Sequence, residues 1–199
     1  MTTYHQAVNK QKELFLAGKT KEIAYRAEAL NKLRDGIRAN ERKLLDALKA
    51  DLNKSEFEAY TSEIGVVLEE IRFTLKHLRS WVKPQKVKTP ITHIGSKSYI
   101  YSEPYGVALI ISPWNYPFQL AIAPLIGAIA AGNCAVIKPS ELTPSTSEVL
   151  AELIAKLYPE EYITVAQGGV ETSTALLNER FDYIFFTGSV PVGKVVMEA

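Results

Sequence analysis

The first 83 residues carry apolar side chains at intervals of three and four positions, which places them on one face of an α-helix. Three such stripes are formed by Ile23, Ala27, Leu30, Leu33 and Ile37, by Leu44, Leu45 and Leu48, and by Tyr60, Ile64, Val67, Ile71, Leu75 and Leu78. Asn40 stands just before the second stripe, where an N-cap is expected. Pro84 follows the third stripe and should end it. We predict a helical region over residues 1–83 whose apolar faces build a core.

The helical period disappears between residues 84 and 103. Pro84 and Pro90 bracket a basic link, and residues 91–101 hold two short β-type runs around Gly95-Ser96. Two such runs joined by a glycine-containing turn are typical of a β-hairpin. We predict a linker and a short β-hairpin in this segment.

From residue 104 onward, short apolar runs alternate with helical patterns. The runs predict strands at 107–111, 135–137, 162–165 and 183–186. The helical patterns lie at 118–131, 145–157 and 171–178, and a further helix has barely begun when the chain ends. Ser145 and Glu148 have the spacing of a capping box at the start of the second of these helices. The alternation predicts an α/β fold with a parallel, doubly wound, Rossmann-like sheet that is incomplete at the C-terminus.

The stretch from 107 to 137 contains no charged residue and is long enough to span a bilayer. Three prolines and a Gly-Asn pair divide it into short pieces. Such breakers favour a buried strand, turn, helix and strand over a membrane helix. We therefore predict no membrane segment here.

The overall composition adds constraints on partners and compartment. A net charge of +1 gives no basic excess, so we expect no nucleic-acid partner. The first residues lack a basic region followed by an apolar one, so we expect no signal peptide. Cys134 is the only cysteine and cannot form an internal disulfide, which fits a reducing, cytoplasmic setting. It begins a buried strand and has no histidine nearby, so we interpret it as a small core residue.

Ligands of parallel sheets bind at the carboxyl ends of the strands, and three segments there carry candidate chemistry. Asn115 lies in a proline-rich turn after the first strand; its amide could stabilise a developing oxyanion, or merely bond its own turn. Lys138 and Glu141 follow the second strand and could hold a ribose diol, or form a solvated loop before a helix.

The third segment is Thr-Gly-Ser-Val-Pro-Val-Gly-Lys at residues 187–194, after the fourth strand. A glycine turn that leads into a helix can bind a pyrophosphate, although it can also be purely structural. The glycines are five apart, so the G-x-G-x-x-G fingerprint is absent. The P-loop spacing is met, but Val195 stands where a Ser or Thr should bind magnesium, which makes a nucleotide triphosphatase a weak alternative.

Four motifs occur together in the second half of the chain. They are Pro-Trp-Asn-Tyr-Pro-Phe at 113–118, Ala-Gly-Asn at 131–133, Lys-Pro-Ser-Glu at 138–141 and Phe-Thr-Gly-Ser at 186–189. In order and spacing they resemble the aldehyde dehydrogenase superfamily. The short N-terminal region and the Asn-Tyr-Pro-Phe run are most similar to its class-3, fatty-aldehyde-type branch. The resemblance covers essentially all 199 residues.

The resemblance implies oxidation of an aldehyde to a carboxylic acid with NAD or NADP. A cysteine thiolate attacks the aldehyde, hydride passes to the cofactor, and a glutamate-activated water hydrolyses the thioester. By the resemblance, Asn115 is the oxyanion donor. Cofactor contacts are implied for Lys138 and Glu141 at the adenosine ribose, and for Gly188, Ser189 and Gly193 at the pyrophosphate. A glutamate on the ribose fits NAD, and the 2′-phosphate of NADP would be repelled unless Lys138 offsets the charge.

The chain departs from the family pattern in one respect. The family's catalytic glutamate and nucleophilic cysteine lie beyond the motifs present here, and Cys134 does not match the nucleophile. We therefore expect a cofactor-binding fragment without a catalytic domain, divided into 1–83 (helical), 84–103 (linker and hairpin) and 104–199 (Rossmann-like). The alternative is a non-catalytic, truncated dinucleotide-binding protein. The resemblance also implies a homodimer assembled partly through the hairpin, with a small-molecule aldehyde as substrate.

Overall fold

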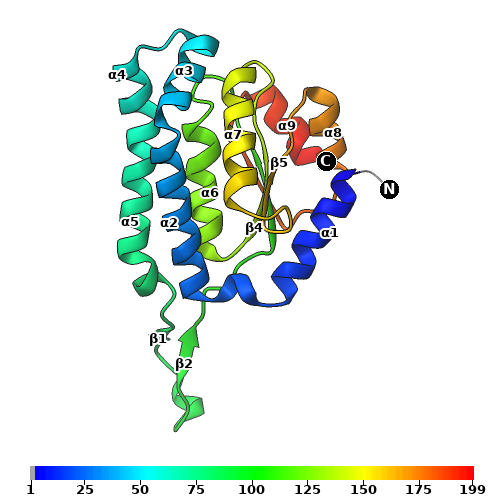
Figure 1. Cartoon of the computed structure of the whole chain (residues 1–199). Helices are drawn as coiled ribbons and strands as arrows, with labels where there is room; N and C mark the ends of the chain where they lie inside the picture. Colours follow the sequence, from blue (N-terminus) through cyan, green and yellow to red (C-terminus); the bar gives the residue numbers. More distant parts are fainter. Residues whose placement is uncertain (1–2) are drawn as a thin grey trace.

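A computed structural model describes residues 3–199, and its first part is helical, as predicted (Figure 1). The helices are α1 (Thr3–Leu16), α2 (Ile23–Ala39), α3 (Glu41–Leu52), α4 (Glu56–Ala59) and α5 (Gly65–Trp81). A 3₁₀ turn, η1 (Lys19–Lys21), joins the first two, and a π-helical turn, η2 (Tyr60–Ile64), joins the last two. Most residues of the apolar stripes are buried or half-buried, because α2 and α5 pack against each other and α2, α3 and α5 pack on the two later helices, α6 (Gln119–Ala131) and α7 (Pro144–Leu157). Ile23 and Tyr60, at the starts of their stripes, are the exceptions and are 36% and 41% exposed.

The second part forms a four-stranded parallel sheet, which confirms the predicted fold class. Its strands are β3 (Val107–Ile111), β4 (Cys134–Lys138), β5 (Ile163–Val165) and β6 (Tyr183–Phe186), in the order β5-β4-β3-β6. The helices are α6 (Gln119–Ala131), α7 (Pro144–Leu157), α8 (Val170–Leu177) and α9 (Val190–Glu198). The chain moves outward from β3 to β5 and then returns to the other side of β3. The strand order therefore reverses between β3 and β6, which defines a topological switch point.

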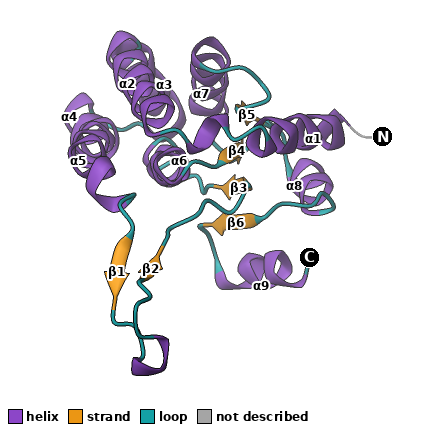
Figure 2. Cartoon of the chain, turned by 90° about the horizontal axis from the view of Figure 1, so that it is seen from below, coloured by secondary structure: helices purple, strands orange, loops and turns teal. Residues whose placement is uncertain are grey.

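Two helical layers enclose the sheet (Figure 2). The larger core lies on the face covered by α2, α5, α6 and α7, and a smaller one lies under α1, α8 and α9. All five residues of β3 and all five of β4 are buried. This explains the uncharged stretch 107–137, which forms β3, α6 and β4. In the described part of the chain, no helix is both long and apolar enough to cross a bilayer.

The hairpin is present but begins earlier than predicted. β1 (Gln85–Val87) pairs antiparallel with β2 (Ser98–Ile100), and together they project from the body (Figure 1). The first strand expected after Pro90 is wrong, since Pro90 leads into a 3₁₀ turn, η3 (Ile91–His93). The amide of His93 donates to the carbonyl of Pro90 (2.9 Å), which closes that turn. Ile91 is 82% exposed, so no sheet face is available there to favour a strand.

Two predicted helix caps are also corrected. Asn40 does occupy the N-cap position of α3, but its side chain accepts no bond from that helix; it donates back to the carbonyl of Gly36 (2.8 Å), in the last turn of α2. The capping box at Ser145 is wrong, because α7 begins one residue earlier, at Pro144. The amides of Ser145 and Thr146 instead donate to the carboxylate of Asp51 in α3, at 3.1 and 2.7 Å. A side chain distant in sequence therefore caps α7.

Candidate functional site

The three segments singled out by their position after strands meet at one edge of the sheet. Ile111 is in register with Lys138 on one side and with Phe186 on the other. The amide of Ser112 donates to the carbonyl of Lys138 (3.1 Å), and the amide of Thr187 donates to the carbonyl of Ile111 (3.0 Å). The loops after β3, β4 and β6 therefore converge at the carboxyl edge, beside the switch point where such sheets bind ligands.

Asn115 lies in the exposed loop between β3 and α6. Its main-chain carbonyl accepts a hydrogen bond from Nζ of Lys54 (3.0 Å). Within residues 3–199, no hydrogen bond joins the Asn115 side chain to its own turn, so the local-turn interpretation gains no support. The loop fixes the backbone of Asn115 and leaves the residue exposed to a ligand.

Lys138 and Glu141 form an ion pair at the carboxyl end of β4. Lys138 is only 3% exposed, and its Nζ donates to Oε2 of Glu141 at 2.8 Å. This hydrogen bond from an ammonium group lowers the pKa of the Glu141 carboxyl. The Glu141 side chain remains 44% exposed. The Glu141 carboxylate is therefore ionised and accessible, and its hydrogen bond with the buried Lys138 fixes its position.

Gly188 and Gly193 bring the turn after β6 close to the ring of Phe186. A Cβ at Gly188 would lie 2.5 Å from that ring, and one at Gly193 would lie 3.3 Å from it. Ser189 occupies the N-cap position of α9 with an extended backbone (φ −74°, ψ 153°), and Pro191 lies in the first turn, as predicted. The missing side chains allow the backbone to approach closely, which suits the binding of a phosphate group by main-chain amides.

The helices that begin at this edge differ in what occupies their N-termini. At α6, the carboxylate of Glu63 accepts from the amides of Phe118 (2.9 Å) and Gln119 (3.2 Å). At α7, Asp51 has the same role, and α8 carries Glu171 in its first turn. Of these described helix starts, that of α9 has neither an acidic residue in its first turn nor a side-chain cap. Its partial positive charge is therefore open to an external anion.

Sequence reasoning did not find Asp51, Lys54 or Glu63. All three lie in the N-terminal helical region, which pattern analysis assigned only to the core. Lys54 and Glu63 are 8% and 0% exposed, although their residue types are usually solvated. Nothing local in the sequence marks them, because the backbone groups that they bind lie 55 to 95 positions away.

Cys134 is confirmed as a core residue. It is buried at the amino end of β4, and burial raises the pKa of its thiol to about 12. A thiol in this state is a poor nucleophile, because the thiolate is the reactive form. Within residues 3–199, no group of three or more His, Cys, Asp or Glu side chains is placed to hold a metal ion.

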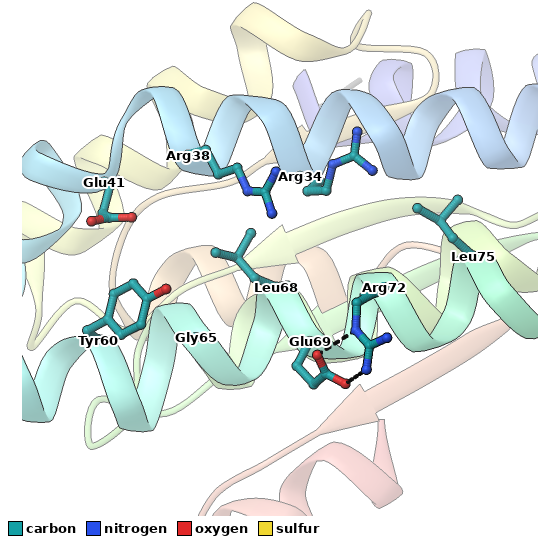
Figure 3. A pocket seen from close by; sticks show the side chains of 9 residues that line it. All are labelled: Arg34, Arg38, Glu41, Tyr60, Gly65, Leu68, Glu69, Arg72 and Leu75. Carbon is teal, nitrogen blue, oxygen red and sulfur yellow. Dashed lines mark hydrogen bonds and ion pairs between the residues drawn. The ribbon is translucent and has the colours of Figure 1, made fainter.

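A separate hollow of 660 Å³ lies between α2 and α5 (Figure 3). Its lining includes Arg34, Arg38 and Arg72, but Arg34 pairs with Asp35 (2.9 Å) and Arg72 pairs with Glu69. None of the loops at the carboxyl edge contributes to it. We therefore do not include this hollow in the candidate site.

Comparisons with known proteins point to the same family as the sequence motifs. The profile of the aldehyde dehydrogenase family matches residues 2–199. The chain is 48% identical over 199 residues to 4,4'-diaponeurosporen-aldehyde dehydrogenase of Staphylococcus aureus, which is 100% of this chain and 43% of that protein. It is 46% identical over 192 residues to aldehyde dehydrogenase family 3 member A2 of Pongo abelii, covering 96% of this chain and 40% of the relative.

A solved structure gives the same result. The substrate-bound state of Staphylococcus aureus AldH superposes with a TM-score of 0.98 at 47% identity, and the match covers 100% of this chain and 43% of that one. The chain thus spans about two fifths of the length of these relatives. Family-3 enzymes among them confirm the class-3 resemblance. On the evidence of its motifs, its fold and these matches, the chain belongs to the aldehyde dehydrogenase family.

Proposed function

We propose that the complete protein oxidises an aldehyde to a carboxylic acid, and that this chain supplies its binding residues for a nicotinamide dinucleotide. The observation that carries the proposal is the open start of α9 beside a glycine turn, where the neighbouring helix starts already hold carboxylates. When bound, the nicotinamide accepts a hydride from the substrate. The following roles fall to residues of this chain.

The turn at Gly188, Ser189 and Gly193 binds the pyrophosphate. Main-chain amides and the positive end of the α9 dipole face the anion there, and no carboxylate of this helix start competes with it. Side chains at either glycine would crowd the turn against Phe186. The residues present therefore fit the group that the family implies.

Lys138 and Glu141 bind the adenosine ribose. The ionised Glu141 accepts from the ribose hydroxyls, and Lys138 holds the carboxylate in place. Because the lysine is buried and already paired with Glu141, it offers little charge to a 2′-phosphate. This arrangement favours NAD over NADP.

Asn115 donates its side-chain amide to the oxygen of the reacting carbonyl. Its loop follows β3, the strand next to β6, so it lies on the other side of the switch point from the pyrophosphate turn. A donor held at this position stabilises negative charge as it develops in the transition state. The nucleophile is not Cys134, since that thiol is buried and protonated.

The hairpin supports assembly into a homodimer. Val87, Ile91, Ile94, Ile100 and Tyr101 are all exposed on this projecting arm. Apolar side chains concentrated on an arm of this kind are typical of a surface that is covered by another subunit. A second subunit of the same protein is the proposed partner.

The test uses the complete gene product with an aldehyde and NAD, with NADH formation followed by absorbance. Asn115→Ala should lower turnover about a hundredfold or more, because one oxyanion donor is lost, and leave NAD affinity nearly unchanged. Unchanged turnover would remove Asn115 from the mechanism. NAD binding without any aldehyde oxidation would instead favour the alternative function, a non-catalytic dinucleotide-binding protein. The observation that supports this alternative is the unreactive, buried thiol of Cys134.

A further inference from the structure

A buried ion pair lies behind the Asn115 loop. Lys54, between α3 and α4, donates to Glu63 of the π-helical turn η2, and their side chains are 8% and 0% exposed. The transfer of two charges from water into the protein interior is unfavourable, and their mutual attraction offsets only part of that cost. A pair of this kind contributes little to stability by itself, so its contacts indicate what else it does.

Within the described residues, the further hydrogen bonds of the two side chains lead into the segment around Asn115. Nζ of Lys54 donates to the main-chain carbonyl of Asn115 (3.0 Å) and lies 4.2 Å from the centre of the Tyr116 ring. Oε2 of Glu63 accepts from the amides of Phe118 and Gln119, at 2.9 and 3.2 Å. The pair therefore contacts the chain at four positions: Asn115, Tyr116, Phe118 and Gln119.

The loop needs such support because its own backbone bonding is sparse. Two of its residues, Pro113 and Pro117, have no amide hydrogen to donate. Asn115 and Tyr116 are both exposed to solvent. An oxyanion donor works only when it is held in place, and an error of 1 Å can cost about a hundredfold in rate.

We propose that Lys54 and Glu63 are positioning residues for Asn115. Lys54 fixes the Asn115 peptide through its carbonyl, and Glu63 anchors both Lys54 and the start of α6, so that the Asn115 amide is held toward the substrate oxygen. This inference rests on the oxyanion role proposed above. It assigns a catalytic consequence to two side chains that would not touch the substrate.

The test compares Lys54→Met and Glu63→Gln with the unaltered complete protein. Each should lower kcat about tenfold to a hundredfold, as expected for a misplaced donor, while the Kd for NAD changes by less than about twofold. In an Asn115→Ala background, Lys54→Met should add almost no further loss, because the group that it positions is absent. Matched controls are Lys32→Met and Glu28→Gln, which remove an exposed pair within α2 and should leave kcat unchanged.

Each outcome is decisive. If Lys54→Met lowers kcat by the same factor with and without Asn115, the lysine does not act through it and the proposal is wrong. If Asn115→Ala alone has no effect, the proposed oxyanion role fails first. If the variants do not fold, hydrogen exchange in the unaltered protein decides. The amides of Phe118 and Gln119 should exchange slowly although first-turn amides lack helical partners, and fast exchange would contradict the contact with Glu63.

Discussion

The helix starts of α6 and α7 differ from that of α9, although all three follow a strand at the same edge of the sheet. Glu63 and Asp51 accept hydrogen bonds from the first amides of α6 and α7. Among the described residues, no side chain caps α9, and its first turn has no acidic residue. A carboxylate at a helix start stabilises the helix but occupies the position that an external anion would take. The comparison shows that one edge of the sheet holds two helix starts capped by carboxylates and a third that is open.

The layer that covers each face explains the difference. α6 and α7 lie on the face shared with α2, α3 and α5, so acidic side chains from the N-terminal region reach their first turns (Figure 2). α9 lies on the opposite face, with α1 and α8. The N-terminal helices therefore do more than fill a core, because they decide which helix starts stay open.

Giving α9 a carboxylate of its own should have the largest effect on this contrast. Ser189→Asp places an acid at the N-cap, where it competes with and repels a pyrophosphate, so the Kd for NAD should rise about tenfold or more, or ~1.4 kcal/mol. Ser189→Asn is the matched control, since it caps without charge and should change the Kd much less. Fluorescence titration with NAD measures both. Equal affinities for the two variants would mean that the pyrophosphate is not bound at α9.

Removing Asp51, the α3 carboxylate that caps α7, should affect stability and not binding. Asp51→Ala leaves the amides of Ser145 and Thr146 without their acceptor, which should cost about 1 kcal/mol of unfolding free energy and lower Tm by about 2–4 °C. The Kd for NAD should stay the same. Asp46→Ala, on the same helix but paired only at the surface with Arg42, is the control and should change stability by less than about 0.5 kcal/mol. A similar loss in both variants would contradict the capping role, as thermal melts would show.

The smallest expected effect is a pH dependence at Glu141. Its pKa is lowered by Lys138, so the folded protein keeps the carboxylate ionised below the usual value of 4.5. A depressed pKa means that the pair's stabilising effect is present above the usual carboxyl pKa and is lost as pH falls through the folded value. NAD affinity should therefore stay level from about pH 7 to about pH 5 and weaken only below that. A loss of NAD affinity centred well above pH 5, and absent in Glu141→Gln, would show that Lys138 does not keep the Glu141 carboxylate ionised.

The sequence by itself determined the architecture of the second half of the chain. Alternating apolar runs and helical patterns predicted β3 to β6 and the helices between them, because strands buried on both faces and amphipathic helices have distinct periods. The positions of Asn115, Lys138, Glu141 and the 188–193 turn after strands were predicted for the same reason. Their roles at the site stay predictions, as does the division at 1–83, 84–103 and 104–199.

The tertiary structure alone decided how the helix starts are filled and how the Asn115 loop is held. The capping box at Ser145 matched a local pattern, yet Asp51, some 94 positions away, binds that amide instead. The Lys54–Glu63 pair reaches Asn115 and Phe118 across 55 to 61 positions. Local rules describe bonds within a few residues, and a charged side chain takes whichever donors the packed fold brings to it. Those donors are known only once the N-terminal helices are placed against the sheet.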